Sequence, residues 1–150
     1  MTEDERGRVL IAEDDYLVSR MLQGLLIQRG FDVVGQASNG AEAVAMTKDL
    51  EPDVVVMDVQ MPDINGLEAS RRIQETTPTP IVVLTAYERL DLVEMAAEAG
   101  VGAYLVKPPN ARELERAGRR RIGPSRPPRP AGWNSREAAH GGHGVTQPSH

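Results

Sequence analysis

The stretch Asp53-Val54-Val55-Val56-Met57-Asp58-Val59-Gln60-Met61-Pro62-Asp63-Ile64-Asn65-Gly66 joins a short apolar run to a polar loop. The run 53–57 is rich in valine and almost continuously apolar, which is typical of a strand buried on both faces of a parallel sheet. Asp58 follows it directly. The sequence therefore predicts one carboxylate at the carboxyl end of a buried strand, the edge at which α/β sheets bind their ligands.

Four further runs resemble this one, and a longer segment with helical periodicity follows each of the five. These further runs are 8–12, 32–36, 81–85 and 103–106. After the first run, the helical stripe consists of Val18, Met21, Leu22, Leu25 and Leu26. Such alternation predicts right-handed βαβ crossovers. We expect an α/β, flavodoxin-like (βα)5 fold, a doubly wound parallel sheet with strand order 2-1-3-4-5.

Two helices carry specific expectations. The second begins at Asn39-Gly40, where Glu42 is placed to complete a capping box, with Val44 and Ala45 facing inward. The fifth begins near Asn110, but its apolar stripe ends at Ala117 and Gly118 costs a helix about 1 kcal/mol. We therefore expect a fifth helix that is short or imperfect after Ala117.

Length and charge suggest one domain with a distinct tail. The 150 residues suffice for a single domain, and 1–117 hold 11 Lys and Arg against 21 Asp and Glu, whereas 118–150 hold 6 against 1. An acidic domain does not suit nucleic acid or anionic membranes. Residues 123–150, rich in Arg, Pro and Gly, bury too little apolar surface to fold. We expect a flexible N-terminus at 1–7, a folded domain at 8–122 and a disordered basic tail at 123–150.

Cysteine content and hydropathy bear on the compartment. The chain has no cysteine, which excludes a disulfide scaffold and a thiol enzyme and favours a reducing compartment. Its first residues are acidic and polar, unlike a signal peptide, and no apolar run approaches the roughly 18 residues of a membrane span. We expect a soluble, cytoplasmic protein without a membrane partner.

The predicted strand ends bring acidic and basic groups together. Glu13, Asp14 and Asp58 would converge, and carboxylates about 4 Å apart repel by roughly 4 kcal/mol per pair at an effective dielectric constant near 20. A hard dication relieves that repulsion, and a site of few carboxylates that keeps waters suits Mg²⁺. A carboxylate such as Asp58 can attack a phosphoryl group, whose charge a fixed ammonium from Lys107 would offset.

Two further polar residues lie at the predicted strand ends. Thr85, which ends the fourth strand, can donate its hydroxyl to a phosphoryl oxygen. Asp15 follows the acid pair, and we interpret it as the N-cap of the first helix rather than as a metal ligand.

These pieces resemble the receiver domain of two-component response regulators over about residues 8–117. The matching motifs are Glu13-Asp14-Asp15, Asp58-x-x-Met61-Pro62-x-x-x-Gly66, Thr85-Ala86 and Tyr104-x-x-Lys107-Pro108. The resemblance implies that Asp58 accepts a phosphoryl group from a sensor histidine kinase or a phosphotransfer protein.

The resemblance also assigns roles to the remaining residues. It implies Mg²⁺ held by Glu13, Asp14, Asp58 and the backbone carbonyl of Gln60. It implies that Thr85 and Lys107 bind the phosphoryl oxygens, that the Lys107-Pro108 bond is cis, and that Thr85 and Tyr104 form a switch. Gln60 and Tyr87 match positions that tune the lifetime of the phosphorylated state. The signal would pass to a downstream protein through the fourth helix, fifth strand and fifth helix.

Two other function classes remain as alternatives. A haloacid-dehalogenase type of phosphatase needs an acid two residues after its nucleophile, where this chain has Gln60, and no histidine precedes the tail. We therefore expect no enzyme beyond self-phosphorylation from small donors and slow self-dephosphorylation. The front half also resembles receivers of antitermination regulators, which carry an RNA-binding domain, but nothing after Ala117 has the required helical pattern. We expect no nucleic-acid partner.

The tail itself supports only weak hypotheses. Arg119-Arg120-Arg121 is interpreted as part of a solvated segment, and His140-x-x-His143 lacks a third metal ligand. The composition break at Gly118 motivates the hypothesis that the tail is a remnant of a longer, truncated or frame-shifted regulator.

Overall fold

Five parallel strands form the centre of the structure, a computed structural model that describes residues 7–86 and 90–122. The elements in chain order are β1 Arg8–Ala12, α1 Tyr16–Gln28, β2 Asp32–Ala37, α2 Gly40–Leu50, β3 Val54–Asp58, α3 Gly66–Thr76, β4 Ile81–Thr85, α4 Leu90–Glu98, β5 Ala103–Val106 and α5 Ala111–Ile122. The strand order is β2-β1-β3-β4-β5, and all four pairings are parallel. The predicted fold class is confirmed.

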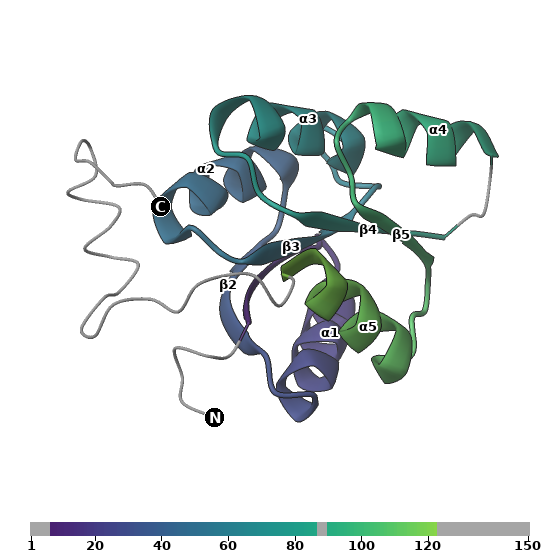
Figure 1. Ribbon diagram of the computed structural model, residues 1–150. Helices are drawn as coiled ribbons and strands as arrows, with labels where there is room; N and C mark the ends of the chain where they lie inside the picture. The colour runs from purple at the N-terminus through teal and green to yellow at the C-terminus, as the bar shows by residue number, and fades with distance from the viewer. Residues whose placement is uncertain (1–6, 87–89, 123–150) are drawn as a thin grey trace.

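The helices cover both faces of the sheet. Figure 1 shows α1 and α5 on one face and α2, α3 and α4 on the other. The side chains of the central strands alternate between two cores. Leu10, Val55 and Val83 belong to the core under α2, α3 and α4. Val9, Val56 and Leu84 belong to the core that contains Leu22 and Leu26 of α1 and Leu114 of α5.

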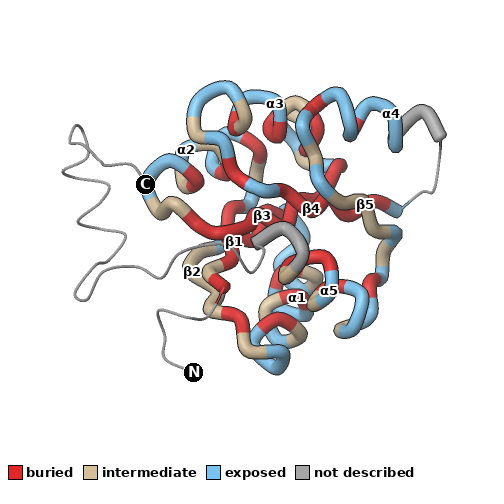
Figure 2. Tube along the Cα trace, viewed as in Figure 1, coloured by how far each residue is buried: buried red, intermediate tan, exposed pale blue. Residues whose placement is uncertain are grey.

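The burial of the central strands explains their sequence. Every residue of β3 and β4 is buried, and these strands form the inner part of the sheet in Figure 2. A strand with no solvent-facing side needs apolar residues at every position, as the run 54–57 provides. Asp58 is the last residue of β3 and the first polar one.

Side-chain caps begin four of the described helices, among them α5, where Asn110 Oδ1 accepts the Glu113 N–H at 2.8 Å. Asp15 Oδ1 accepts hydrogen bonds from the N–H groups of Leu17 at 2.9 Å and Val18 at 3.2 Å, so its expected N-cap role is confirmed. Asn39 and Asn65 cap α2 and α3 in the same way. These caps satisfy N–H groups that have no partner inside the helix.

The expected inward face of α2 was wrong at one position. Ala45 is exposed and Val44 is half-buried, whereas Ala43 and Thr47 are buried. The Thr47 hydroxyl donates to the Ala43 carbonyl at 2.7 Å, and this bond allows a polar residue to face the core. Because alanine occurs on both buried and exposed helix faces, Ala45 did not indicate which face of α2 points to the core. In α1, Met21 is likewise 41% exposed although the periodicity placed it on the inner stripe.

Helix α5 is not shortened at Ala117, because it continues through Gly118 to Ile122. A Cβ on Gly118 would lie 3.1 Å from Phe31 Cζ, so the glycine lets the helix approach the ring closely. The Arg119 guanidinium lies 4.5 Å from the centre of that ring and donates to the Arg29 carbonyl at 2.7 Å. Contacts with the connection between α1 and β2 therefore hold the end of the helix, and Gly118 belongs to the folded domain despite the change in composition there.

The boundaries of the folded part differ slightly from those expected. Gly7 is buried, and its carbonyl accepts a hydrogen bond from the Asp32 N–H at 2.8 Å, so the sheet contacts begin one position earlier. The expectations for 1–6 and 123–150 lie outside the described residues. Among the helices that the structure describes, none has the length and apolar character to cross a bilayer.

Candidate functional site

The carboxyl ends of three strands bring the expected charged residues together. Ala12 at the end of β1 pairs with Met57 in β3, so Glu13 and Asp58 follow at the same level of the sheet. Lys107 follows β5 directly. Because all strands run in one direction, their ends meet at one edge, and the fold supplies the convergence that the sequence predicted.

The three carboxylates form a compact acidic cluster. Glu13, Asp14 and Asp58 each offer an oxygen atom, and these atoms lie within 4.8 Å of one another. Glu13 is 3% exposed and Asp58 is 4% exposed, whereas Asp14 is exposed to solvent. Two buried carboxylates and one open to water leave room for a cation that keeps part of its hydration shell.

Lys107 forms an ion pair with both buried carboxylates. Its Nζ lies 3.0 Å from Glu13 Oε1 and 3.1 Å from Asp58 Oδ2. The Lys107 N–H donates to the Thr85 carbonyl at 2.7 Å, and the Lys107-Pro108 peptide bond is cis. Although burial opposes it, pairing with Glu13 and Asp58 raises the pKa of Lys107 above its usual value. The ammonium therefore stays charged.

One ammonium does not compensate the whole cluster. Burial, together with the nearby Asp58 charge, raises the pKa of Glu13 to about 7, against the lowering effect of the Asp15 N–H and Lys107. The Asp15 N–H donates to Glu13 Oε2 at 3.1 Å. Glu13 Oε1 is buried and accepts no hydrogen bond from any described residue, although Lys107 Nζ is close to it.

These features fit a divalent cation. The raised pKa of the Glu13 carboxyl and the presence of a single ammonium among three close carboxylates both mark a site with too much negative charge. A dication among the three carboxylates would neutralise that charge, and the all-oxygen donor set suits Mg²⁺.

An open pocket of about 650 Å³ lies in front of the cluster. Its walls are Glu13, Asp14, Asp15, Val18, Asp58, Val59, Gln60, Met61, Pro62, Asn65 and Lys107. Gln60 is exposed, and its N–H donates to Asp58 Oδ1 at 3.2 Å. Since this bond fixes the start of the loop after β3, the Gln60 backbone lies beside the carboxylate.

The expected switch residues lie on the neighbouring strands. Thr85 ends β4 and is 2% exposed, and the described residues that line the pocket do not include it. Tyr104 in β5 is half-buried and packs against the core under α2, α3 and α4. Their switch role stays a prediction. Tyr87, expected to tune lifetime, lies outside the described residues.

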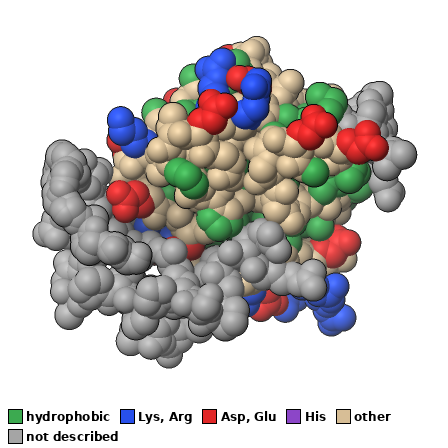
Figure 3. Space-filling model, turned by 45° about the horizontal axis from the view of Figure 1, so that its top comes forward, with side chains coloured by type: hydrophobic (Ala, Val, Ile, Leu, Met, Phe, Trp, Pro, Cys, Tyr) green, Lys and Arg blue, Asp and Glu red, His purple; other side chains and the backbone are tan. Residues whose placement is uncertain are grey.

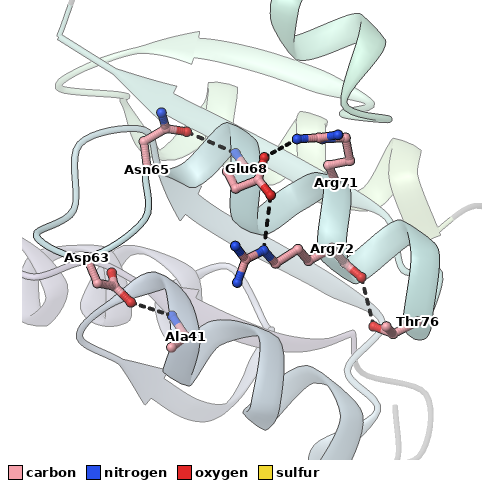
Figure 4. Close-up of polar contacts among 7 residues, drawn as sticks. All are labelled: Ala41, Asp63, Asn65, Glu68, Arg71, Arg72 and Thr76. Carbon is pink, nitrogen blue, oxygen red and sulfur yellow. Dashed lines mark hydrogen bonds and ion pairs between the residues drawn. The ribbon is translucent and has the colours of Figure 1, made fainter.

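The loop between β3 and α3 makes structural contacts that the sequence did not predict. A Cβ on Gly66 would lie only 2.1 Å from the Asp58 carbonyl oxygen, so the loop closes tightly under the strand end. Asn65 both caps α3 and lines the pocket. The carboxylate of Asp63 accepts the N–H groups of Gly40 and Ala41 at 2.8 Å each. Figure 4 shows the bond to Ala41. The only sequence signal was the glycine that closes the motif.

Comparisons with known proteins agree with this geometry. The profile of a family described as response regulator receiver domain matches residues 9–119. The transcriptional regulatory protein PdtaR of Mycobacterium tuberculosis is 48% identical over 101 residues, which cover 67% of this chain and 49% of that protein. The chemotaxis protein CheY of Thermotoga maritima is 39% identical over 102 residues, which cover 67% of this chain and 85% of that protein. The solved response regulator domain of Thermotoga maritima CheB aligns with a TM-score of 0.74 at 28% identity, covering 79% of this chain and 97% of that chain. The chain thus spans about half the length of the Mycobacterium relative.

Proposed function

The chain belongs to the response regulator receiver domain family, and from that premise we propose that it carries a phosphoryl group on Asp58 and signals to a downstream protein. The donor would be a sensor histidine kinase or a phosphotransfer protein. The observation that carries the proposal is the placement of Asp58, a buried carboxylate between an acid pair and an ammonium at the floor of an open pocket.

Asp58 suits a nucleophile because a carboxylate needs no base to activate it. One of its oxygens forms the new bond to phosphorus while the bond between phosphorus and the donor breaks, and the leaving group keeps that electron pair. The Lys107 ammonium, held 3.1 Å from Asp58 Oδ2, would contact the oxygens of the incoming group. The Thr85 hydroxyl is proposed as a second donor to them.

Glu13, Asp14, Asp58 and the backbone carbonyl of Gln60 would hold Mg²⁺, as their oxygen atoms and excess negative charge favour. When bound, the cation supplies positive charge that offsets the charge of the transferring group. Glu13 has a second role, because its ion pair keeps Lys107 at the pocket.

The signal would leave through the surface formed by α4, β5 and α5. Thr85 and Tyr104 lie on adjacent strands, with Tyr104 paired to Val83 and Thr85 paired to Val106. We propose that movement of the Thr85 side chain toward a phosphoryl group changes the position of the Tyr104 side chain on the adjacent strand. Apolar side chains on this surface include Val93, Met95 and Val106, which are 39%, 47% and 37% exposed. Figure 3 shows apolar side chains interspersed with charged ones over the α3 and α4 side.

A small-donor experiment tests the proposal directly. The full chain is incubated with acetyl phosphate and Mg²⁺, and its intact mass is measured before peptide mapping. We expect one added phosphate on the peptide that contains Asp58, and none on Asp58→Asn. Absence of the added mass, or its location on another segment, would contradict the proposal.

A nucleic-acid output is the alternative class, and the name of the Mycobacterium relative, a transcriptional regulatory protein, is the observation that favours it. The excess of acidic residues in 1–117 argues for a protein partner instead. Titration of labelled RNA and DNA at near-physiological salt separates the two. Tight binding that depends on phosphorylation would support the alternative.

A further inference from the structure

The loop between β3 and α3 is anchored to a neighbouring helix at its tip. Both oxygens of Asp63 accept hydrogen bonds at the N-terminus of α2, from Gly40 and from Ala41. Although desolvation opposes it, these bonds lower the pKa of Asp63. The carboxylate is therefore ionised at neutral pH and complements the positive end of the helix dipole.

Close packing reinforces the hydrogen bonds. A Cβ on Gly40 would lie 2.4 Å from Ile64 Cγ1 and 2.7 Å from the Ile64 carbonyl oxygen, so only glycine lets the loop lie so near the helix. Asp63 and Ile64 thus contact the same end of α2 through polar and apolar groups.

The same end of α2 is connected to the acid pair. The Ala37 carbonyl, at the end of β2 and shortly before the helix, accepts the Glu13 N–H at 2.9 Å. Asp63 therefore ties the loop that carries Gln60 to the segment that holds Glu13. On the other side of the pocket, Lys107 connects Glu13 with Asp58.

The base of the loop is fixed independently of Asp63. The Gly66 N–H donates to the Val59 carbonyl at 2.7 Å, and the Gln60 N–H donates to Asp58 Oδ1 at 3.2 Å. These two bonds hold the start of the loop at the end of β3, and the Val59 N–H donates to the Leu84 carbonyl of β4 at 3.0 Å. The pairing of β1 with β3 places Asp58 beside Glu13, and the contact at the tip adds a second link between the loop and the segment that precedes α2.

We infer that Asp63 is a positioning residue for the metal site: it holds the Gln60 backbone at the distance from Glu13 and Asp14 at which the site binds Mg²⁺. This inference rests on the proposed function, since it concerns the affinity of that same site. Asp63 touches neither the metal ligands nor the phosphoacceptor through any hydrogen bond that the structure describes, and acts through the loop.

Mg²⁺ titration of the purified full chain by calorimetry tests the inference. Asp63→Asn keeps the size of the side chain but turns one acceptor into a donor that faces an N–H group. We expect its Mg²⁺ Kd to rise on the order of tenfold, as for other groups that orient metal ligands. At saturating Mg²⁺, the rate of Asp58 labelling by acetyl phosphate should return to that of the parent.

Asp49→Asn is the matched control. Asp49 is an exposed carboxylate in the last turn of α2, so its loss changes net charge equally without touching the loop. Its Kd should stay within about twofold of the parent, the size of a screened surface-charge effect. Equal Kd changes in both variants, or none in Asp63→Asn, would overturn the inference and leave the proposed function intact.

Two further results separate the remaining cases. A parent chain that binds no Mg²⁺ would overturn the metal site of the proposed function and the inference with it. Hydrogen exchange on the parent provides a check that needs no variant: the Gly40 and Ala41 amides should be protected and should gain protection when Mg²⁺ is added. Amides that exchange as fast as those of an open loop would count against the anchor.

Discussion

The substitution Gly66→Ala should destabilise the domain and reduce the phosphorylation of Asp58 without altering any charged group. The added Cβ would lie 2.1 Å from the Asp58 carbonyl oxygen, 2.9 Å from its carbonyl carbon and 3.0 Å from Met57 Cγ. The first two neighbours are backbone atoms at the end of a fully buried strand, so they cannot turn away as a flexible side chain would. We expect a loss of about 3 kcal/mol or more in the free energy of unfolding, the upper range for overpacking.

Urea denaturation of parent and variant measures this loss, and the melting temperature should fall by roughly 10 °C or more. Labelling by acetyl phosphate should decrease as well, because the strand end must shift to admit the methyl group. A loss below about 1 kcal/mol, within the range of ordinary substitutions, would refute the reasoning.

Gly24→Ala is the matched control, because the same methyl group is added where there is space. Gly24 lies inside α1 with no atom within 4 Å of the added Cβ. Alanine favours a helix over glycine by about 0.8–1 kcal/mol, so this variant should be more stable than the parent. The same chemical change should therefore have opposite signs at the two positions.

Three further predictions concern charge. Since the pKa of Glu13 is raised to about 7, its contribution to the stability of the metal-free protein is complete below about pH 4.5 and is lost as the pH rises through 7, by up to about 3 kcal/mol. Denaturation across this pH range should show the decline, and Glu13→Gln should remove it; an unchanged slope would contradict the raised pKa. Mg²⁺ should raise the melting temperature at pH 7.5. The free energy of unfolding should increase by about 1.4 kcal/mol for each tenfold rise in Mg²⁺ concentration above Kd, and this effect should vanish in Asp14→Asn. Arg119→Ala should cost about 1–2 kcal/mol by urea denaturation, since it removes the contact with Phe31 and the bond to the Arg29 carbonyl, whereas the exposed Arg112→Ala should cost almost nothing.

Local periodicity determined most of the fold, and the strands show why. The runs 53–57 and 81–85 were placed within one residue of β3 and β4, because a strand buried on both faces needs an unbroken apolar sequence. The convergence of Glu13, Asp14, Asp58 and Lys107 followed from the parallel direction of the strands. The sequence could predict that part of the site because each residue ends or closely follows a recognisable strand.

Contacts between distant segments were beyond prediction from the sequence. Gly118 appeared to weaken α5, but it admits the ring of Phe31, which is far away in the sequence. Asp63 looked like an ordinary loop residue, and its partners Gly40 and Ala41 lie in another crossover. In both cases a tertiary contact that no periodicity encodes decided the outcome, and at Gly118 it outweighed the local preference against a helix.

A charge count explains why the phosphorylated site would need further donors. Three carboxylates and the Lys107 ammonium leave an excess of negative charge, and a dication would neutralise it. Converting the Asp58 carboxylate to an acyl phosphate adds about one negative charge at neutral pH. That charge would lie beside the end of β4, where burial makes an uncompensated charge costly. In the proposed function the Thr85 hydroxyl would offset part of this charge, and Thr85 lies at the end of the strand that pairs with both β3 and β5. The added negative charge would thus favour the proposed movement of the Thr85 side chain toward the phosphoryl group.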